Sequence, residues 1–187
     1  MKIYIMKFKK ITSSHSENFN EIWELYESSF PPDEKRDFEK QVKIFCKEPY
    51  TFYAVYNKDL LIGIMDIWNL GKFVFIEHLA VKEKLRGQGF GTKLLKDFII
   101  QRNKKIILEV ERPNTNAAKI KIKFYEKQGF KLNKYNYIQP PYNKDKNSVP
   151  LFLMTYPKAI SKSEFSKIRK KIHATVYECE KPYLGIN

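Results

Sequence analysis

The chain has 187 residues, of which 43% are hydrophobic and 15% aromatic, enough for one globular core and too apolar for global disorder. Its 35 basic and 21 acidic residues give a formal net charge of +14, which can attract nucleic acid or phosphate-bearing ligands. Only five of the basic residues are arginine, whereas base readout and bidentate phosphate contacts draw heavily on arginine. We therefore expect a lysine-rich surface that favours an anionic ligand, with no specific nucleic-acid partner.

No segment has the length of a membrane span. The longest apolar stretch runs only from Leu60 to Met65, against about 20 residues for a bilayer, and Lys7 interrupts the N-terminal apolar run too early for a signal peptide. Cys46 and Cys179 stand far apart without a CxxC pair, a pattern typical of reduced thiols rather than of a disulfide or zinc site. The expected protein is cytoplasmic, with no membrane contact and no bound metal.

The first part of the chain predicts a strand and two helices. Alternating residues over 2–8 indicate the strand. Ser14 and Glu17 have the spacing of a capping box, so a helix should follow and end at Pro31. Asp33 is expected to cap a second helix. The apolar positions of that helix are Phe38, Val42 and Phe45.

The remainder of the chain mixes strands and helices. Aromatic and β-branched runs predict strands, which are expected at 51–56, 60–68, 73–81, 105–111, 131–138 and 149–156, with a short one at 175–177. Apolar residues at helical spacing predict helices, which are expected after a glycine run at 86–91, at 114–128 before Gly129, and at 163–171, where Ser161 and Glu164 form a capping box. The order indicates a mixed α/β fold, with one long loop at 139–148.

The glycine run Arg86-Gly87-Gln88-Gly89-Phe90-Gly91 lies between a predicted strand and a helix. Glycines let backbone approach a ligand, and a helix start presents N–H groups to an anion. A Walker loop is excluded because Thr92 precedes Lys93. A dinucleotide fingerprint lacks its last glycine, although Glu109 lies near the ribose-binding spacing. A phosphate site is favoured over these interpretations and over a turn that serves packing alone.

Three motifs in order resemble the GNAT acetyltransferase superfamily. Arg86, Gly89 and Gly91 match the family's Q/R-x-x-G-x-G/A motif. Upstream, Ile-Glu-His-Leu-Ala-Val at 76–81 is similar to its central strand, and downstream, Phe-Tyr-Glu-Lys-Gln-Gly-Phe at 124–130 is similar to its Y-E-K-x-G-F ending. Each motif alone is modest, but their order is specific.

The resemblance covers 73–130 directly, and the order of the flanking elements extends it over about 2–157. It implies an α/β (α+β) fold in which helices flank a mixed, mostly antiparallel central sheet. A single domain over 1–187 is expected, with a C-terminal helical extension at 158–187 whose role the resemblance leaves unassigned.

The resemblance also implies acetyl-CoA as cosubstrate and direct transfer of its acetyl group to a primary amine of a small molecule or peptide, through a ternary complex. In the family the pyrophosphate lies on the amides of the glycine run, and the pantetheine pairs with the preceding strand. The implied cofactor-binding residues are Leu79, Ala80, Val81, Leu85, Arg86, Gly87, Gln88, Gly89, Phe90, Gly91, Thr92 and Asn116.

The resemblance further implies Tyr125 as the acid that protonates the leaving thiolate. An amide near Leu79 would bind the oxyanion. The acceptor ammonium must lose a proton, for which Glu77 is the leading base and Glu109 the alternative. His78 should point away from Glu77, because strand residues alternate, and is expected to be packed or on the surface rather than to share the site.

One position departs from the family. Many members carry an asparagine seven residues before the tyrosine, but here position 118 is alanine, with Asn116 and Asn114 nine and eleven residues upstream of Tyr125. Either an asparagine still reaches the pantetheine, or both cap the helix that follows Pro113, which we favour.

The acceptor is left open by the sequence. The segment 29–32, the loop at 139–142 and Trp68 lie where the family places its acceptor cleft, although turn formation and core packing explain them equally well. The rival functions are a noncatalytic acyl-CoA-binding or regulatory module and, less favoured, a basic nucleic-acid-binding protein. The oligomeric state is also open, a homodimer included.

Overall fold

The computed structural model describes residues 6–184, which form seven strands and five α-helices. These residues fall into two compact units. The first unit contains the residues up to 31 together with 35–69 and 76–103, and the second contains 32–34, 70–75 and the residues from 104 onward.

The first unit is built on strands that pair in the order β1-β2-β3-β4. The β1–β2 and β2–β3 pairings are antiparallel. Strand β4 begins in the second unit and continues in the first. The elements are β1 (Met6–Ile11), α1 (Phe19–Ser29), α2 (Phe38–Ile44), β2 (Tyr50–Asn57), β3 (Leu60–Asn69), β4 (Phe73–Val81), the 3₁₀ turn η2 (Glu83–Leu85) and α3 (Phe90–Ile100).

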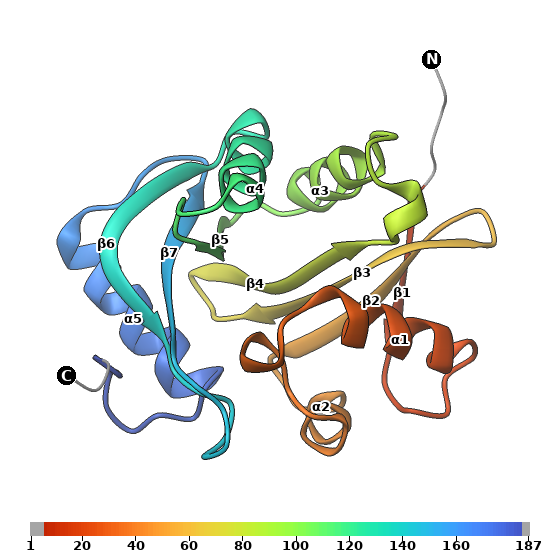
Figure 1. Ribbon diagram of the computed structural model, residues 1–187, viewed down its shortest axis with the longest axis horizontal. Coiled ribbons are helices and arrows are strands. Elements are labelled where there is room, and N and C mark those ends of the chain that lie inside the picture. The colour runs from red at the N-terminus through yellow and green to blue at the C-terminus, as the bar shows by residue number, and fades with distance from the viewer. Residues whose placement is uncertain (1–5, 185–187) are drawn as a thin grey trace. The chain divides into compact units, whose positions relative to one another are not determined.

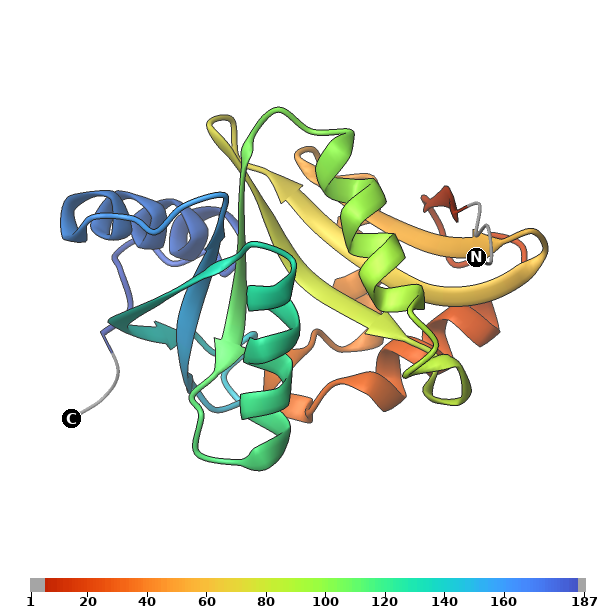
Figure 2. The same cartoon turned by 90° about the horizontal axis from the view of Figure 1, so that it is seen from above.

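Aromatic side chains fix the helices of the first unit on the two faces of its sheet, with α3 on one face and α1 and α2 on the other (Figures 1 and 2). Phe98 of α3 packs on Phe8 of β1, with ring centroids 6.4 Å apart. On the opposite face Tyr26 of α1 and Phe45 after α2 both contact Phe52 of β2. This burial of aromatic area provides the main driving force for packing the helices.

The second unit pairs its strands in the order β5-β7-β6, with both pairings antiparallel. Helices α4 and α5 lie on opposite sides of these strands (Figures 1 and 2). Phe165 of α5 packs on Tyr135 of β6, and Phe130 after α4 packs on Tyr156 of β7. The elements are the 3₁₀ turn η1 (Pro32–Glu34), β5 (Lys105–Glu111), α4 (Asn116–Lys127), β6 (Lys131–Gln139), β7 (Val149–Tyr156) and α5 (Lys162–Thr175).

The predicted mixed fold, with mostly antiparallel strands flanked by helices and a helix in the C-terminal extension, is confirmed. Ser161 and Glu164 form the expected capping box, and Gly129 follows α4 with a positive φ of 92°. The single domain over 1–187 stays a prediction. No helix within the described part of the chain is long and apolar enough to cross a membrane.

Two predicted helix starts are wrong, and each misassigned side chain has a different partner. Helix α1 begins after Asn18, which is in the left-handed region and makes no side-chain cap, while Glu17 pairs with Lys9. Helix α2 begins after Asp37 rather than Asp33. The carboxylate of Asp33 accepts hydrogen bonds from the backbone and side chain of Asn147.

Two predicted strands also differ from the structure. The first strand spans Met6–Ile11 rather than 2–8, and residues 2–5 lie outside the described residues. The expected strand at 175–177 is wrong, because α5 continues through Thr175 and Val176 bonds back to Ile172 at the helix end. The capping box therefore supports a helix longer than its apolar spacing indicated.

Gly63 on β3 allows the close approach of β4, and its replacement tests that contact. A Cβ added at Gly63 would lie 2.2 Å from the carbonyl oxygen of Ala80, a backbone atom. We expect Gly63→Ala to lower the free energy of unfolding by about 3 kcal/mol, the upper end of the usual cost of overpacking because the clash is with a backbone atom, measured by urea denaturation.

The matched control is Gly71→Ala, because Gly71 has a φ of +79° with no atom within 4 Å of the added Cβ. Backbone strain alone should then lower the unfolding free energy by about 1 kcal/mol. Equal losses in Gly63→Ala and Gly71→Ala would contradict the close approach of the two strands.

Candidate functional site

The glycine run forms an open turn at the N-terminus of α3. Gly87 and Gly89 have φ values of +74° and +86°, and an added Cβ would meet no atom within 4 Å at either position. Gly89 is the N-cap of α3 and supplies no side-chain cap. The N–H groups of the first helical turn lack acceptors within the helix. This end of α3 can therefore bind an anion through backbone N–H groups and the helix dipole.

Two predicted cofactor-binding side chains hold this turn in place. Arg86 Nε donates to the carbonyl oxygen of Val81 at 3.1 Å, and Gln88 Nε2 donates to the carbonyl oxygen of Lys84 at 2.9 Å. The end of β4 is thereby tied to the turn that leads into α3. Both strand end and turn lie in the first unit, as the predicted set from Leu79 to Thr92 requires.

Glu77, the predicted base, lies in the middle of β4 with its side chain only 1% exposed. Its Oε1 accepts from Arg36 Nη1 at 2.7 Å, and its Oε2 accepts from Trp68 Nε1 at 2.7 Å. The Arg36 guanidinium also lies 5.5 Å from the centroid of the Trp68 ring. The carboxylate is therefore held on both oxygens by donors from outside β4. The sequence predicts Trp68 at an acceptor wall or in the core and carries no local signal for a role of Arg36.

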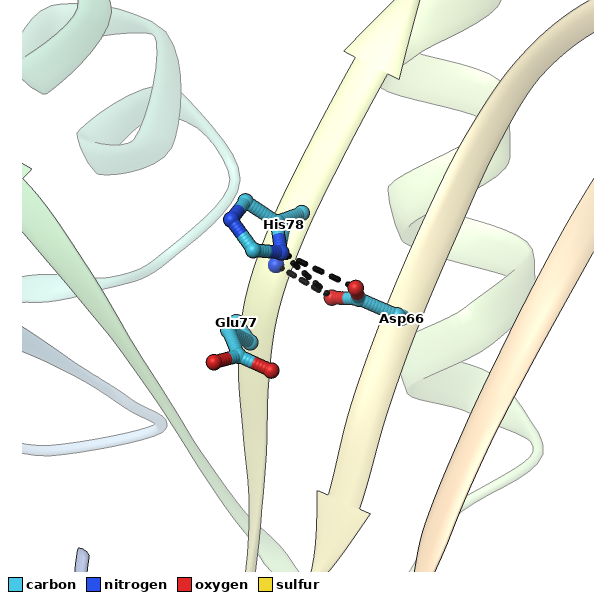
Figure 3. Close-up of side chains that lie close together, drawn as sticks. All are labelled: Asp66, Glu77 and His78. Carbon is cyan, nitrogen blue, oxygen red and sulfur yellow. Dashed lines mark hydrogen bonds and ion pairs between the residues drawn. The ribbon is translucent and has the colours of Figure 1, made fainter. Parts of the chain in front are cut away.

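The neighbouring His78 is buried, as expected, and Asp66 of β3 holds it (Figure 3). Asp66 accepts from the backbone N–H of His78 at 2.6 Å, and its two oxygens lie 2.9 and 3.1 Å from His78 Nδ1. The prediction that His78 stays apart from Glu77 is wrong. One oxygen of Asp66, one of Glu77 and one ring nitrogen of His78 all lie within 4.8 Å of one another.

A run of hydrogen bonds connects Asp66 to the segment that carries Arg36. Tyr50 donates to Asp66 at 2.9 Å, and Gln41 donates to the hydroxyl of Tyr50. Tyr26 donates to Gln41 at 3.4 Å and accepts from the backbone N–H of Arg36 at 3.0 Å. Burial, followed by the charge of Asp66, raises the pKa of both tyrosines well above the usual range. Both hydroxyls therefore remain protonated donors at neutral pH.

Asp66, Glu77 and His78 are close enough to suggest a metal site, but their surroundings do not fit one. Hydrogen-bond donors already occupy both oxygens of each carboxylate. A divalent cation at Glu77 would also face the Arg36 guanidinium at short range, which Coulomb repulsion opposes. We assign no metal to this cluster.

Tyr125, the predicted acid, lies on α4 in the second unit and is 8% exposed. Its ring packs edge-on against Phe124 and Phe130. Burial raises the pKa of Tyr125 above its usual value. The phenol therefore stays protonated at neutral pH and is a proton donor rather than a phenolate.

Glu109, the alternative base, lies on β5 in a group of phenols within the second unit. Tyr137 donates to its Oε1, and the hydroxyl of Tyr177 lies 2.9 Å from its Oε2. Tyr177 in turn packs on Tyr142 of the long loop, with ring centroids 5.1 Å apart. No local pattern in the sequence links Tyr137 and Tyr177 to β5, so their contact with Glu109 could not be predicted.

The two asparagines near α4 do not cap it, so the favoured interpretation is wrong. Thr115 is the N-cap, and its hydroxyl oxygen accepts from the backbone N–H of Ala118 at 3.1 Å. Asn116 is the first residue of the helix, and Asn114 precedes the cap. Thr115 directly precedes the helix and caps it in place of the two asparagines, and a threonine at this position is a cap that the local sequence predicts.

The long loop at 139–148, a predicted border of the acceptor cleft, is held by Asp33. Gln139 Nε2 donates to the carbonyl oxygen of Asp33 at 2.8 Å, and Asn147 donates to its carboxylate. These contacts lie within the second unit and explain why Asp33 is not a helix cap.

Comparison with known proteins relates the chain to one family of acetyltransferases. The model of the "Acetyltransferase (GNAT) family" matches residues 17–130. YjbC of Bacillus subtilis (strain 168), provisionally named an acetyltransferase, is 39% identical over 62 residues, or 32% of this chain. The match spans 31% of YjbC, less than a third of that relative's length.

Solved structures share the fold. A Bacteroides thetaiotaomicron protein, provisionally assigned as an acetyltransferase of the GNAT family, is 32% identical, and the match covers 93% of this chain and 99% of that one with a TM-score of 0.87. Arabidopsis thaliana Naa50, solved with the bisubstrate analogue CoA-Ac-MVNAL, is 20% identical, with coverage of 83% and 99% and a TM-score of 0.56. At that identity the likeness to Naa50 establishes the fold alone.

The ion pair of Arg36 with Glu77 can be tested through stability. Both side chains are buried, at 6% and 1% exposure, and removal of one partner takes the opposite charge away from the other. We expect Arg36→Met to lower the free energy of unfolding by about 3–5 kcal/mol in urea denaturation.

The double variant Arg36→Met with Glu77→Gln removes both charges and should recover part of that loss. Arg102→Met is the matched control, because Arg102 packs on Phe98 at 4.1 Å and should lose about 1 kcal/mol or less. A double variant no more stable than Arg36→Met alone would show that the two charges do not depend on each other.

Proposed function

Since residues 17–130 match the family model, the chain belongs to the GNAT family of acetyltransferases, and on this premise we propose that it is an acetyl-CoA-dependent N-acetyltransferase. The acetyl group passes directly to a primary amine of a small molecule or peptide in a ternary complex. The observation that carries the proposal is the open glycine turn at the uncapped N-terminus of α3. The CoA-Ac-MVNAL analogue in Naa50 joins coenzyme A to a peptide in that relative.

The backbone supplies most of the proposed cofactor contacts. N–H groups from Gly87 to Thr92 bind the pyrophosphate, with the positive end of the α3 dipole behind them. The N–H groups of Leu85 and Arg86 instead donate to the carbonyl oxygens of Lys82 and Glu83, at 2.9 and 3.0 Å. The pantetheine pairs with the backbone of Leu79 to Val81, as an added strand would. Asn116 completes the proposed set from the first turn of α4.

Proton movements divide between Tyr125 and a carboxylate. As the amine attacks the thioester, the carbonyl oxygen becomes negative and is stabilised by the N–H of Leu79. Tyr125, whose phenol is protonated at neutral pH, then donates its proton to the leaving thiolate. Glu77 takes the proton of the acceptor ammonium, with Glu109 as the alternative.

The hydrogen bonds of Glu77 set a condition on its role as a base. Arg36 and Trp68 donate to its two oxygens, so a bound ammonium must share or displace one of these donors before its proton can pass. Displacement of the indole N–H of Trp68 retains the buried ion pair, and we propose this as the productive arrangement.

The release of free thiol from acetyl-CoA in the presence of an amine panel tests the function as a whole. A catalytic protein releases thiol only when an accepted amine is present. A noncatalytic acyl-CoA-binding module would bind acetyl-CoA without turnover of any amine, and a nucleic-acid-binding protein would bind duplex with a steep salt dependence.

Gly89→Asp tests the cofactor site. The added carboxylate lies in open space at the N-cap of α3, so it should repel a pyrophosphate without a clash inside the protein. We expect at least about a hundredfold loss of coenzyme A affinity by calorimetry, equivalent to about 2.8 kcal/mol.

Gly89→Ala is the control, because it brings the same strain at a φ of +86° without the charge. Coenzyme A affinity should fall far less in Gly89→Ala than in Gly89→Asp. Normal affinity in a folded Gly89→Asp protein would exclude this turn as the phosphate site.

Tyr125→Phe tests the proposed acid, since it removes the hydroxyl and keeps the ring that packs on Phe130. We expect kcat to fall by about a hundredfold or more, the typical contribution of a general acid. Coenzyme A affinity should stay near that of the wild type. An unchanged kcat would remove Tyr125 from the mechanism.

A further inference from the structure

The carboxylate of Asp66 is buried inside the sheet of the first unit, with no exposed surface. It accepts hydrogen bonds from the backbone N–H of His78 at 2.6 Å and from the hydroxyl of Tyr50 at 2.9 Å. One of its oxygens also lies 2.9 Å from His78 Nδ1. Asp66 thus joins β3 both to the backbone and to a side chain of β4.

Stability alone does not account for a carboxylate in this position. Removing a carboxylate from water has a desolvation penalty, and well-packed apolar residues often replace buried ionic groups without loss of stability. Neighbouring residues of β3 are apolar, Met65 and Ile67 among them. The groups around Asp66 are therefore polar only because the carboxylate is there to accept from them, and its contacts with β4 call for a further explanation.

The contact with the His78 N–H has a consequence for the conformation of β4. Strand N–H groups ordinarily bond to carbonyl oxygens of a neighbouring strand, whereas this one donates to the Asp66 side chain. Successive strand residues also normally point to opposite faces, yet Glu77 and His78 approach within 4.8 Å at their polar atoms. Figure 3 shows both side chains beside Asp66.

Asp66 also fixes the tautomer of His78. An ionised carboxylate only accepts hydrogen bonds, so the proton of a neutral His78 lies on Nδ1, and Nε2 is the acceptor. Tyr50 keeps its proton toward Asp66, because burial and the charge of Asp66 raise the pKa of the phenol. The carboxylate is therefore surrounded by donors that hold its position.

We propose that Asp66 is a positioning residue of the acetyltransfer site. It holds the backbone of β4 at His78, and so orients the Glu77 carboxylate on one side and the Leu79 N–H on the other. The inference rests on the proposed function, because Glu77 and Leu79 are the base and the oxyanion donor of that mechanism. Asp66 acts on the reaction only through these two neighbours of His78.

Asp66→Asn is the informative variant. Asparagine has nearly the same shape and retains an oxygen that can accept the His78 N–H, but its NH₂ group would face His78 Nδ1. The ring should then change to the tautomer with the proton on Nε2. ¹⁵N NMR of the His78 ring reports that change directly, with no need for turnover, and the backbone amide proton of His78 should move upfield as its partner loses charge.

Kinetics provide the second readout. We expect Asp66→Asn to lower kcat by about tenfold or more, as small displacements of reacting groups do, with the KM for acetyl-CoA changed by less than about twofold. The loss should exceed that of the matched control Gln41→Leu. Gln41 is fully buried in the same network, and its hydrogen bonds go to Tyr26 of α1 and Tyr50 of β2.

The outcomes separate a positioning role from a structural one. A wild-type kcat in Asp66→Asn, or a loss equal to that of Gln41→Leu at similar unfolding midpoints, would overturn the proposal. An unchanged His78 tautomer would overturn it as well. Asp66→Leu tests the complete removal of the hydrogen-bonding group. If this variant does not fold, the kinetics and the His78 tautomer of Asp66→Asn still distinguish a positioning role from a structural one.

Failure of the proposed function would look different. Wild-type protein would then release no thiol with any amine, whatever the state of Asp66. In that case the change in the NMR chemical shift of the Leu79 backbone amide on addition of coenzyme A remains as the test of whether Asp66 positions β4. A shift of the same size in wild type and Asp66→Asn would refute the positioning of β4 by Asp66, and a diminished shift would support it.

Discussion

The buried ion pair between Arg36 and Glu77 is the constraint on which the first unit depends. A carboxylate in the middle of a strand is costly to bury unless a partner and further hydrogen bonds compensate it. Arg36 supplies the charge and Trp68 the second donor. Because the backbone N–H of Arg36 is in turn bonded to Tyr26, the segment before α2 must take one position relative to both α1 and β4.

The hydrogen bonds behind this ion pair have one direction. From Arg36 to Asp66, each group donates to the next, and Tyr26 and Tyr50 can do so only while they keep their protons. The raised pKa values of both phenols ensure this at neutral pH. A buried network in which every polar group has a hydrogen-bond partner favours one packing arrangement of the core, since a shifted helix would leave buried polar groups without partners.

Local signals in the sequence predicted the fold well, and the errors occurred where a distant residue competed for a polar side chain. The Ser161 capping box is correct because its two partners lie three residues apart. Glu17 and Asp33 are equally good local candidates, but Lys9 and Asn147 bind them instead. In the candidate site, Glu77 and Tyr125 could be predicted because each lies in a motif that resembles the family. Arg36 could not be predicted, because it lies 41 residues from Glu77 and no sequence pattern connects the two. Asp66 stands as a single charge among the apolar residues of β3, which is a local signal of a buried polar contact.

The two proposed proton-transfer groups show why opposite environments suit opposite tasks. Tyr125 is surrounded by aromatic rings, and burial raises its pKa, so its hydroxyl keeps its proton at neutral pH and is available as a donor to the leaving sulfur. Glu77 is buried too, but a guanidinium and an indole N–H hold its carboxylate. An acceptor ammonium has to offer Glu77 a hydrogen bond at least as good as the indole's. A charge-assisted bond from an ammonium meets that requirement, whereas a neutral hydroxyl replaces one neutral donor with another. Under the proposed role of Glu77 as the base, these surroundings favour an amine over an alcohol as the acceptor.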